Sequence, residues 1–133
     1  MKKIILIFIL VFLNNVKAFS QKNLTKNERE SYEYLNFKKI DIELNKTYNE
    51  ILKEYHDDKK FIENLIESQK MWLKFREIEL DLLFPDYPKG TTSDTCRPWY
   101  LKVLTKRRLE HLKIWIEKET NENYCIGSIK WKK

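Results

Sequence analysis

The chain has 133 residues, of which 42% are hydrophobic and 14% aromatic, and this length suits one packed domain. The apolar content is too high for a disordered chain with this share of charged residues. Two Gly and three Pro occur in the whole sequence, which disfavours a many-stranded sheet with its frequent turns and favours long helices.

The N-terminal segment predicts an export signal. Two lysines precede the apolar run 4–13, and small residues around Ala18 suit a signal peptidase. The run is about half as long as a bilayer-spanning helix, and no second apolar run follows it. We therefore expect residues 1–18 to be a signal peptide, with cleavage after Ser20 as the alternative. Residues 19–133 would then form a single domain in the periplasm or outside the cell, without stable membrane insertion.

Cleavage would also change the net charge. The full chain carries 26 basic and 20 acidic residues, a net charge of +6, and removal of the three lysines within residues 1–18 leaves +3. Charges of both signs alternate along the chain, and no basic stripe is interleaved with aromatic residues. This pattern disfavours nucleic-acid binding. The basic cluster at residues 130–133 is interpreted as a solvated terminus, with a contact to anionic surface polymer or lipid as the alternative.

The spacing of apolar residues predicts a first helix over 23–55. The following residues recur at intervals of three and four, which places them on one helical face: Phe37, Ile40, Leu44, Tyr48, Ile51 and Tyr55. Thr25 precedes Glu28 by three residues, which is the pattern of a capping box at a helix start. The polar segment 56–60 contains two aspartates, so we expect a short turn, an aspartate cap and an antiparallel second helix.

A second helix is predicted over 59–84, and Pro85 ends it. Its apolar side is formed by Ile62, Leu65, Trp72, Phe75, Leu80 and Leu83, and we interpret the aromatic residues of this set, like Trp115 further on, as core packing. Segment 85–95 has no helical period and is predicted to be the one long loop. Pro98 is tolerated in the first turn of a third helix, which starts at Thr95 or the next residue and ends near residue 118.

Together these elements predict an all-α fold. We expect a three-helix antiparallel bundle with two long helices, a long loop, a third helix and a short C-terminal tail.

Polar residues interrupt the apolar faces of two predicted helices. Gln69 and Arg76 lie one heptad apart on the second helix, and Arg108 interrupts the third. An unpaired guanidinium at such a position would cost several kcal/mol in desolvation, so carboxylate partners are required. The candidates are Asp41, then Glu43 and Glu77. We predict a buried network that fixes helix register, formed by Asp41, Gln69, Arg76 and Arg108, with a ligand-binding role as the alternative.

Both cysteines, Cys96 and Cys125, would remain after cleavage. In an oxidising compartment two thiols usually form a disulfide, and closing this loop could stabilise the fold by about 3 to 4 kcal/mol. Metal binding is the competing interpretation. Neither histidine, His56 or His111, has a cysteine or a second histidine at chelating spacing. We therefore expect the disulfide and no metal or other cofactor.

The sequence contains no recognisable catalytic constellation. Ser68, Ser93 and Ser128 lack the strand-to-helix turn of a serine hydrolase, and no glycine-rich phosphate loop occurs. His111 lies beside Glu110 and is interpreted as a surface residue rather than a general base. We expect a protein that is not an enzyme.

Three motifs resemble the LprI-type lysozyme-inhibitor domain. Residues 41–48 (DIELNKTY) fit D-x-E-L-N-x-x-Y, and residues 104–112 (LTKRRLEHL) fit L-T-x-x-R-x-x-x-L. Residues 68–77 (SQKMWLKFRE) resemble A-Q-x-x-W-x-x-F-R-D, with Ser68 in place of Ala and Glu77 in place of Asp. The resemblance covers about residues 24–116. Many family members carry a further cysteine pair that is absent here, whereas Cys96 matches the family cysteine before the last helix. The resemblance implies an exported helical domain that inhibits lysozyme.

The leading hypothesis is therefore a protein that binds and blocks a cell-wall muramidase. The alternatives are an envelope scaffold or adaptor that binds another protein, and an immunity protein against a secreted toxin. Loop 85–95 is the candidate contact segment, with an ordinary connection between helices as the alternative. Tyr87 would be its anchor, and Asp86, Ser93 and Asp94 would supply acceptors. A net charge of +3 gives no long-range attraction to a basic lysozyme, so a local acidic patch would have to compensate.

Overall fold

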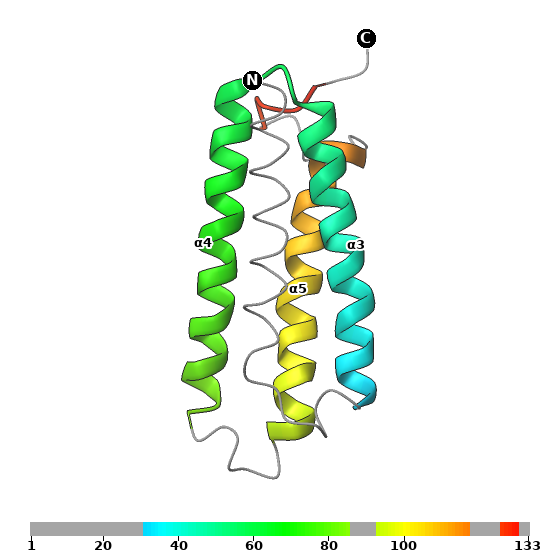
Figure 1. Cartoon of the computed structure of the whole chain (residues 1–133), viewed down its shortest axis with the longest axis vertical. Coiled ribbons are helices and arrows are strands. Elements are labelled where there is room, and N and C mark those ends of the chain that lie inside the picture. The colour runs from blue at the N-terminus through cyan, green and yellow to red at the C-terminus, as the bar shows by residue number, and fades with distance from the viewer. Residues whose placement is uncertain (1–30, 86–92, 118–125, 131–133) are drawn as a thin grey trace, which may run out of the picture.

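The computed structural model describes residues 31–85, 93–117 and 126–130. Within these ranges it contains three helices and no strand: α3 (Tyr32–Glu54), α4 (Lys59–Leu83) and α5 (Ser93–Glu117). Helix α4 runs antiparallel to both α3 and α5 in an elongated bundle (Figure 1). The predicted all-α bundle is therefore confirmed. None of the described helices combines the length and apolar character needed to cross a membrane.

Helix α3 begins later than predicted. Ser31 adopts an extended conformation with ψ 147°, and its Oγ accepts a hydrogen bond of 3.2 Å from the Tyr34 amide. This side chain satisfies one of the free amides of the first turn. The expected start of this helix near Thr25 is wrong, because Ser31 takes the capping role. Thr25 and Glu28 themselves lie outside the described residues.

The ends of α4 agree with the prediction to within one residue. The Asp58 carboxylate caps the helix by accepting a hydrogen bond of 2.9 Å from the Phe61 amide. At the other end, Leu83 is the last helical residue and Phe84 caps the helix just before Pro85. Helix α4 therefore begins where the Asp58 side chain accepts a hydrogen bond from a backbone amide. It ends just before Pro85, which has no amide hydrogen to donate.

Helix α5 begins earlier than predicted, at Ser93. Ser93, Asp94 and Thr95 belong to the helix rather than to the loop, and Pro98 lies inside the helix instead of in its first turn. A proline in the second turn removes one amide hydrogen bond close to the helix end. The helix continues upstream of it, so Pro98 does not mark the helix start.

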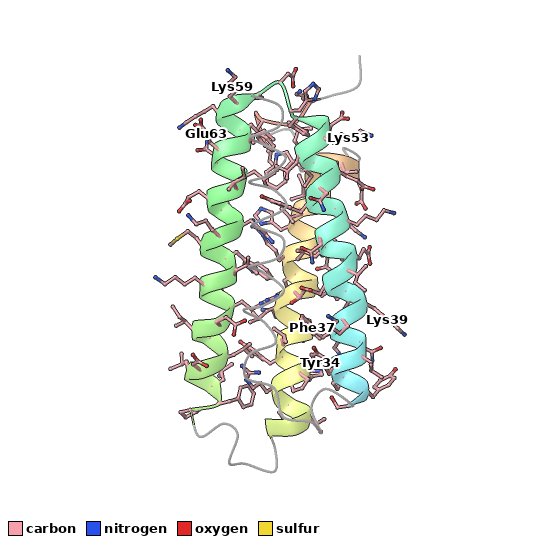
Figure 2. All side chains as sticks on the ribbon, viewed as in Figure 1. Tyr34, Phe37, Lys39, Lys53, Lys59 and Glu63 are labelled. Atoms are coloured by element: carbon pink, nitrogen blue, oxygen red, sulfur yellow. The ribbon has the colours of Figure 1, made fainter. Side chains whose placement is uncertain are left out.

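Two hydrophobic clusters form the core. The larger one comprises Leu44, Tyr48, Ile51, Leu52, Tyr55, Leu65, Leu109 and Leu112. The smaller one, nearer the start of α3, comprises Tyr34, Phe37, Leu80 and Leu101. Figure 2 shows Tyr34 and Phe37 on the side of α3 that faces α5, whereas Lys39 extends away from the bundle. The backbone of α5 lies close to α3 and approaches α4 less closely.

Two residues predicted for the core of α4 are largely exposed. Phe75 and Leu83 expose 49% and 45% of their surface. The buried residues of α4 are Leu65, Gln69, Arg76 and Leu80, so the buried face is narrow. Phe75 precedes Arg76 and therefore lies about 100° around the helix from it. The expectation that Phe75 and Leu83 pack in the core is wrong.

Candidate functional site

A polar layer lies between the two hydrophobic clusters, centred on Arg76. This side chain is 1% exposed. Its Nη1 donates hydrogen bonds to Thr105 Oγ1 at 3.3 Å and, at the long distance of 3.5 Å, to Asp41 Oδ1. Its Nη2 lies 3.8 Å from a Glu77 carboxylate oxygen. In the described part of the chain, the Arg76 Nε–H has no acceptor. Two carboxylates and a hydroxyl therefore compensate the buried charge.

Burial is the dominant electrostatic influence in this layer. It lowers the pKa of Arg76, while the charges of Asp41 and Glu77 oppose that shift. Burial also raises the pKa of Glu77, and Arg76 and then Arg97 oppose this shift. Each ionised group is therefore retained in the interior by an opposite charge close to it.

Arg108 forms a second centre in the layer with neutral acceptors. Its Nε donates to Gln69 Oε1 and its Nη2 donates to Ser68 Oγ, both at 3.0 Å. Burial lowers its pKa, and it forms no ion pair with a carboxylate among the residues that the structure describes. The charge of Arg108 is therefore hydrogen-bonded but not neutralised within this part of the protein.

Trp72 lies between the two arginines. The centroid of its indole ring is 4.9 Å from Arg76 Cζ and 5.8 Å from Arg108 Cζ, distances at which a cation is attracted to the face of an aromatic ring. Its partly buried ring also packs against the larger hydrophobic cluster. Trp72 is therefore a packing residue that additionally stabilises two charges.

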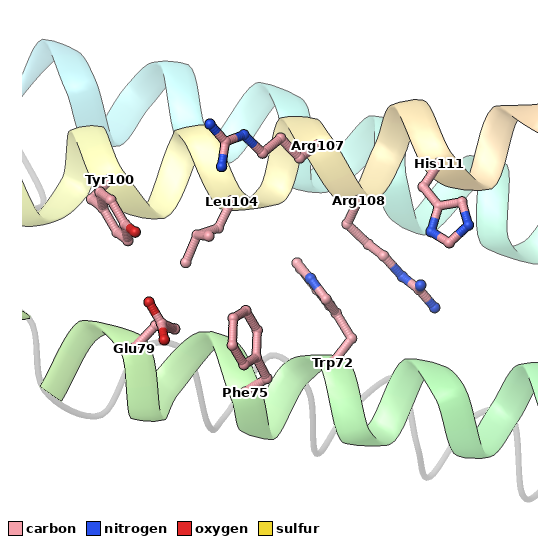
Figure 3. A pocket seen from close by; sticks show the side chains of 8 residues that line it. All are labelled: Trp72, Phe75, Glu79, Tyr100, Leu104, Arg107, Arg108 and His111. Carbon is pink, nitrogen blue, oxygen red and sulfur yellow. The ribbon is translucent and has the colours of Figure 1, made fainter. Parts of the chain in front are cut away.

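A groove of about 350 Å³ opens between α4 and α5 beside this layer. Its lining residues are Trp72, Phe75, Glu79, Tyr100, Leu104, Arg107, Arg108 and His111. Figure 3 shows Glu79 and Tyr100 at one end of the groove and Arg108 and His111 towards the other. Aromatic walls with cations at one end suit the non-covalent binding of a group that is both apolar and acidic.

His111 is exposed and contributes its imidazole to the groove. Its ring centroid lies 5.6 Å from that of Trp115. Burial, and secondly the charge of Arg108, lowers the pKa of His111 below its ordinary value of 6.5. The neighbouring Glu110 carboxylate lies 3.9 Å from Lys106 Nζ on the same helix. The groove therefore presents a neutral imidazole at pH 7 alongside its permanent arginine charges.

The structure brings together the four residues of the predicted network in two pairs. Asp41 meets Arg76, and Gln69 meets Arg108. Glu43, the second candidate partner, instead lies 2.9 Å from Lys113 Nζ.

Two hydroxyl residues of this layer were missed by sequence reasoning, Ser68 and Thr105. Thr105 is fully buried, and its Oγ1 donates a hydrogen bond of 2.8 Å to the Leu101 carbonyl. Its place three residues before Arg108, on the same helical face, is the signal that could have identified it.

The candidate contact residues are only partly described. Asp86 and Tyr87 lie outside the described residues, while Ser93 and Asp94 form the start of α5.

Cys96 is exposed and its thiol is free in the structure. Cys125 lies outside the described residues, so the bond between the two cysteines stays a prediction. In the described part, no group of three or more His, Cys, Asp or Glu is placed to hold a metal ion.

The fold and its polar layer define a small helical-bundle domain held together by buried arginines. The chain belongs to the LprI lysozyme-inhibitor family, because the family model described as "Lysozyme inhibitor LprI" matches residues 20–112. The matched range includes the whole polar layer. No curated protein and no solved structure matches the chain. At the level of the family, this match supports a lysozyme-inhibitor-like function.

Proposed function

We propose that this protein is an exported inhibitor that binds a cell-wall muramidase and blocks it without covalent chemistry. The family match over residues 20–112 is the observation that carries the proposal. Export to the periplasm or beyond the cell rests on the sequence of residues 1–18, which have the pattern of a signal peptide. Such a location would put the protein where muramidases act.

The connection between α4 and α5 is the proposed contact segment. Its two ends are held by long helices, at Pro85 and Ser93, and attachment to rigid elements favours an ordered contact. Tyr87 offers a large contact area with a polar tip, and Asp86 offers an acceptor. The groove end formed by Glu79 and Tyr100 lies close to where this connection leaves the helices.

Local charge near the connection supports binding to a basic enzyme. Glu77, Glu79 and Asp81 are the acidic residues of the last two turns of α4. The Glu77 charge is compensated by Arg76, whereas Glu79 and Asp81 form no ion pair with a described residue and would provide local attraction for a basic partner. At the other end of the groove, Arg107 and His111 would face carboxylates such as those that glycosidases use.

The direct test is a turbidity assay of cell-wall lysis by several lysozyme types, with the purified protein titrated in. We expect micromolar protein to slow at least one type, because an interface anchored by one aromatic residue reaches affinities of about this order. If no lysozyme is slowed, the inhibitor proposal fails. Recovery of a stoichiometric partner from an envelope extract would then favour the adaptor.

A matched pair of variants tests the contact segment. Tyr87→Ala should weaken inhibition by about ten-fold or more, which is the usual effect of truncating an aromatic anchor. Tyr32→Ala removes a tyrosine that is 76% exposed on α3 and belongs to neither the connection nor the groove. The Tyr32 variant should inhibit like the original protein, and equal inhibition by both variants would exclude the Tyr87 anchor.

A further inference from the structure

Helix α4 exposes a row of large apolar side chains that nothing in the family function explains. Met71, Phe75, Ile78 and Leu82 are 57%, 49%, 55% and 70% exposed. Intervals of four, three and four residues place them on one face of the helix. We name these four residues the α4 stripe. A contiguous exposed apolar row of this kind marks an interaction surface.

The stripe differs from the other exposed apolar residues of the bundle. On α3, Ile42 is 66% exposed, but the exposed Lys39 and Lys46 lie about one turn on either side of it. A single apolar side chain between lysines is ordinary for a protein surface. The α4 stripe extends over about three turns without a charged residue on its own line.

Charges beside the stripe indicate which partner it fits. Lys74 and Asp81 lie seven residues apart, on the same flank of the stripe, and both are exposed. Neither forms an ion pair with a described residue. In an antiparallel two-fold pair the same flank of both helices lies on one side of the interface, so Lys74 would lie near the partner's Asp81 and the contact would repeat by symmetry, whereas a parallel two-fold pair would place these flanks on opposite sides.

The stripe is also complementary to itself in shape. A two-fold axis that passes beside α4, level with the midpoint between Arg76 and Glu77, would set Met71 against the partner's Leu82 and Phe75 against the partner's Ile78. Both contacts then occur twice, so every member of the stripe is covered in one isologous interface. We propose that the protein forms a homodimer in which two α4 stripes pack antiparallel.

This dimer extends beyond muramidase binding, and the two surfaces share Phe75, which also lines the groove. One helix face per subunit buries less than a standard protein interface, so association should be weak, with a dissociation constant of about 10 to 100 µM. Met and Phe are residue types enriched in the cores of protein interfaces. The dimer would remove from water apolar surface that a single copy of the bundle leaves exposed.

Sedimentation equilibrium from about 1 to about 200 µM tests the dimer, with protein made from the full coding sequence and purified in the form that the cell produces. The weight-average mass should rise from the monomer mass towards twice that value as the concentration increases. Ile78→Glu should stay monomeric throughout, since it places two carboxylates at the centre of the interface. Ile42→Glu, the matched exposed isoleucine on α3, should dimerise like the original protein.

Charge reversal tests the orientation. Lys74→Glu should weaken dimerisation by about ten-fold, because it creates two like-charge contacts. The double variant Lys74→Glu with Asp81→Lys should restore it, since the opposite charges meet again. Circular dichroism checks that each variant is folded.

The proposal is overturned if the original protein is monomeric at the highest concentration, or if Ile78→Glu dimerises as the original does. A monomer that still slows lysis in the turbidity assay would overturn the dimer alone and leave the inhibitor function intact.

Discussion

Arg76 holds a positive charge at a point where water is almost excluded, 1% of its surface being exposed. Arg76→Ala should lower the free energy of unfolding by about 3 to 5 kcal/mol, because it leaves Asp41 and Glu77 without their cation and opens a cavity. Urea unfolding at pH 7, followed by circular dichroism, measures this change. A loss below about 0.5 kcal/mol would contradict the buried position.

Arg76→Met is the control for volume. Methionine retains much of the aliphatic length and so fills the cavity that alanine opens, but like alanine it leaves Asp41 and Glu77 without their cation. The methionine variant should therefore be more stable than the alanine variant. If both variants lose equal stability, packing by the aliphatic stem contributes less than the charge.

His111 provides a test of the electrostatics at the groove. Arg108→Gln should raise the pKa of His111, because the positive charge of Arg108 is the second cause of its depressed value after burial. An NMR titration of the imidazole protons measures the change. Arg107→Gln is the control, since Arg107 lines the same groove without contributing to the shift. Equal titration of His111 in both variants would exclude the effect of Arg108.

The lowered pKa of His111 also predicts how the stability of the fold changes with pH. The folded protein holds the His111 proton less tightly than the unfolded chain, whose pKa is near 6.5. The stability associated with neutral His111 is therefore present above the unfolded pKa. It is lost as the pH falls from about 6.5 through the depressed folded value.

The sequence pattern predicted the charged residues of the polar layer but not its hydroxyl residues. Arg76 and Arg108 interrupt apolar stripes, and an interruption of that kind requires a buried partner. Ser68 and Thr105 could not be assigned, because hydroxyls are common on helix surfaces and their contacts depend on how each helix is rotated. Phe75 was misplaced for the same reason: the spacing gives a face, but the width of its buried part depends on the neighbouring helices.

At the level of elements, one hydroxyl joins three segments of the chain. The fully buried Tyr55 at the end of α3 donates a hydrogen bond of 3.1 Å to the Trp115 carbonyl on α5, and its oxygen accepts one of 3.1 Å from the Lys130 amide. Trp115 Nε1 donates to Ser128 Oγ at 3.0 Å. Segment 126–130 is thereby attached to the end of the bundle (Figure 1).

Tyr55→Phe should lower the free energy of unfolding by about 1 to 2 kcal/mol, because a backbone amide and a carbonyl lose their partner. Thermal unfolding measures the loss, and hydrogen exchange at the Lys130 amide should accelerate. Tyr32→Phe is the control, since that side chain is exposed and should change neither value. Unchanged exchange at Lys130 in the Tyr55 variant would contradict the bond.

Helix boundaries could be predicted where a single residue determines them, either by capping a backbone amide or by lacking one. Asp58 and Pro85 bound α4, and each acts through the backbone of its own segment. The starts of α3 and α5 were misplaced because several capping residues compete within a few positions, as with Thr25 and Ser31. Pro98 is compatible with either the first or the second turn, so its presence does not locate the first residue of α5.

For the whole molecule, the predicted disulfide remains to be tested. Cys96 and Cys125 should be linked in the exported protein, because an oxidising compartment pairs two thiols. A thiol count on denatured, unreduced protein should find none. Two free thiols would refute the bond and agree with the free Cys96 of the structure. If the bond forms, its reduction should lower the stability by about 3 to 4 kcal/mol.

The polar layer across the middle of the bundle divides the interior into two compartments that share few side chains. A substitution in one cluster should therefore leave the packing of the other unchanged. The double variant Phe37→Ala with Leu112→Ala should lower the free energy of unfolding by nearly the sum of the two single effects. Sliding a helix by one turn, in contrast, would carry each guanidinium away from its acceptors in a single step. Apolar residues of either cluster can therefore be replaced by other apolar residues during evolution, while the arginines of the polar layer keep the helices in the same register.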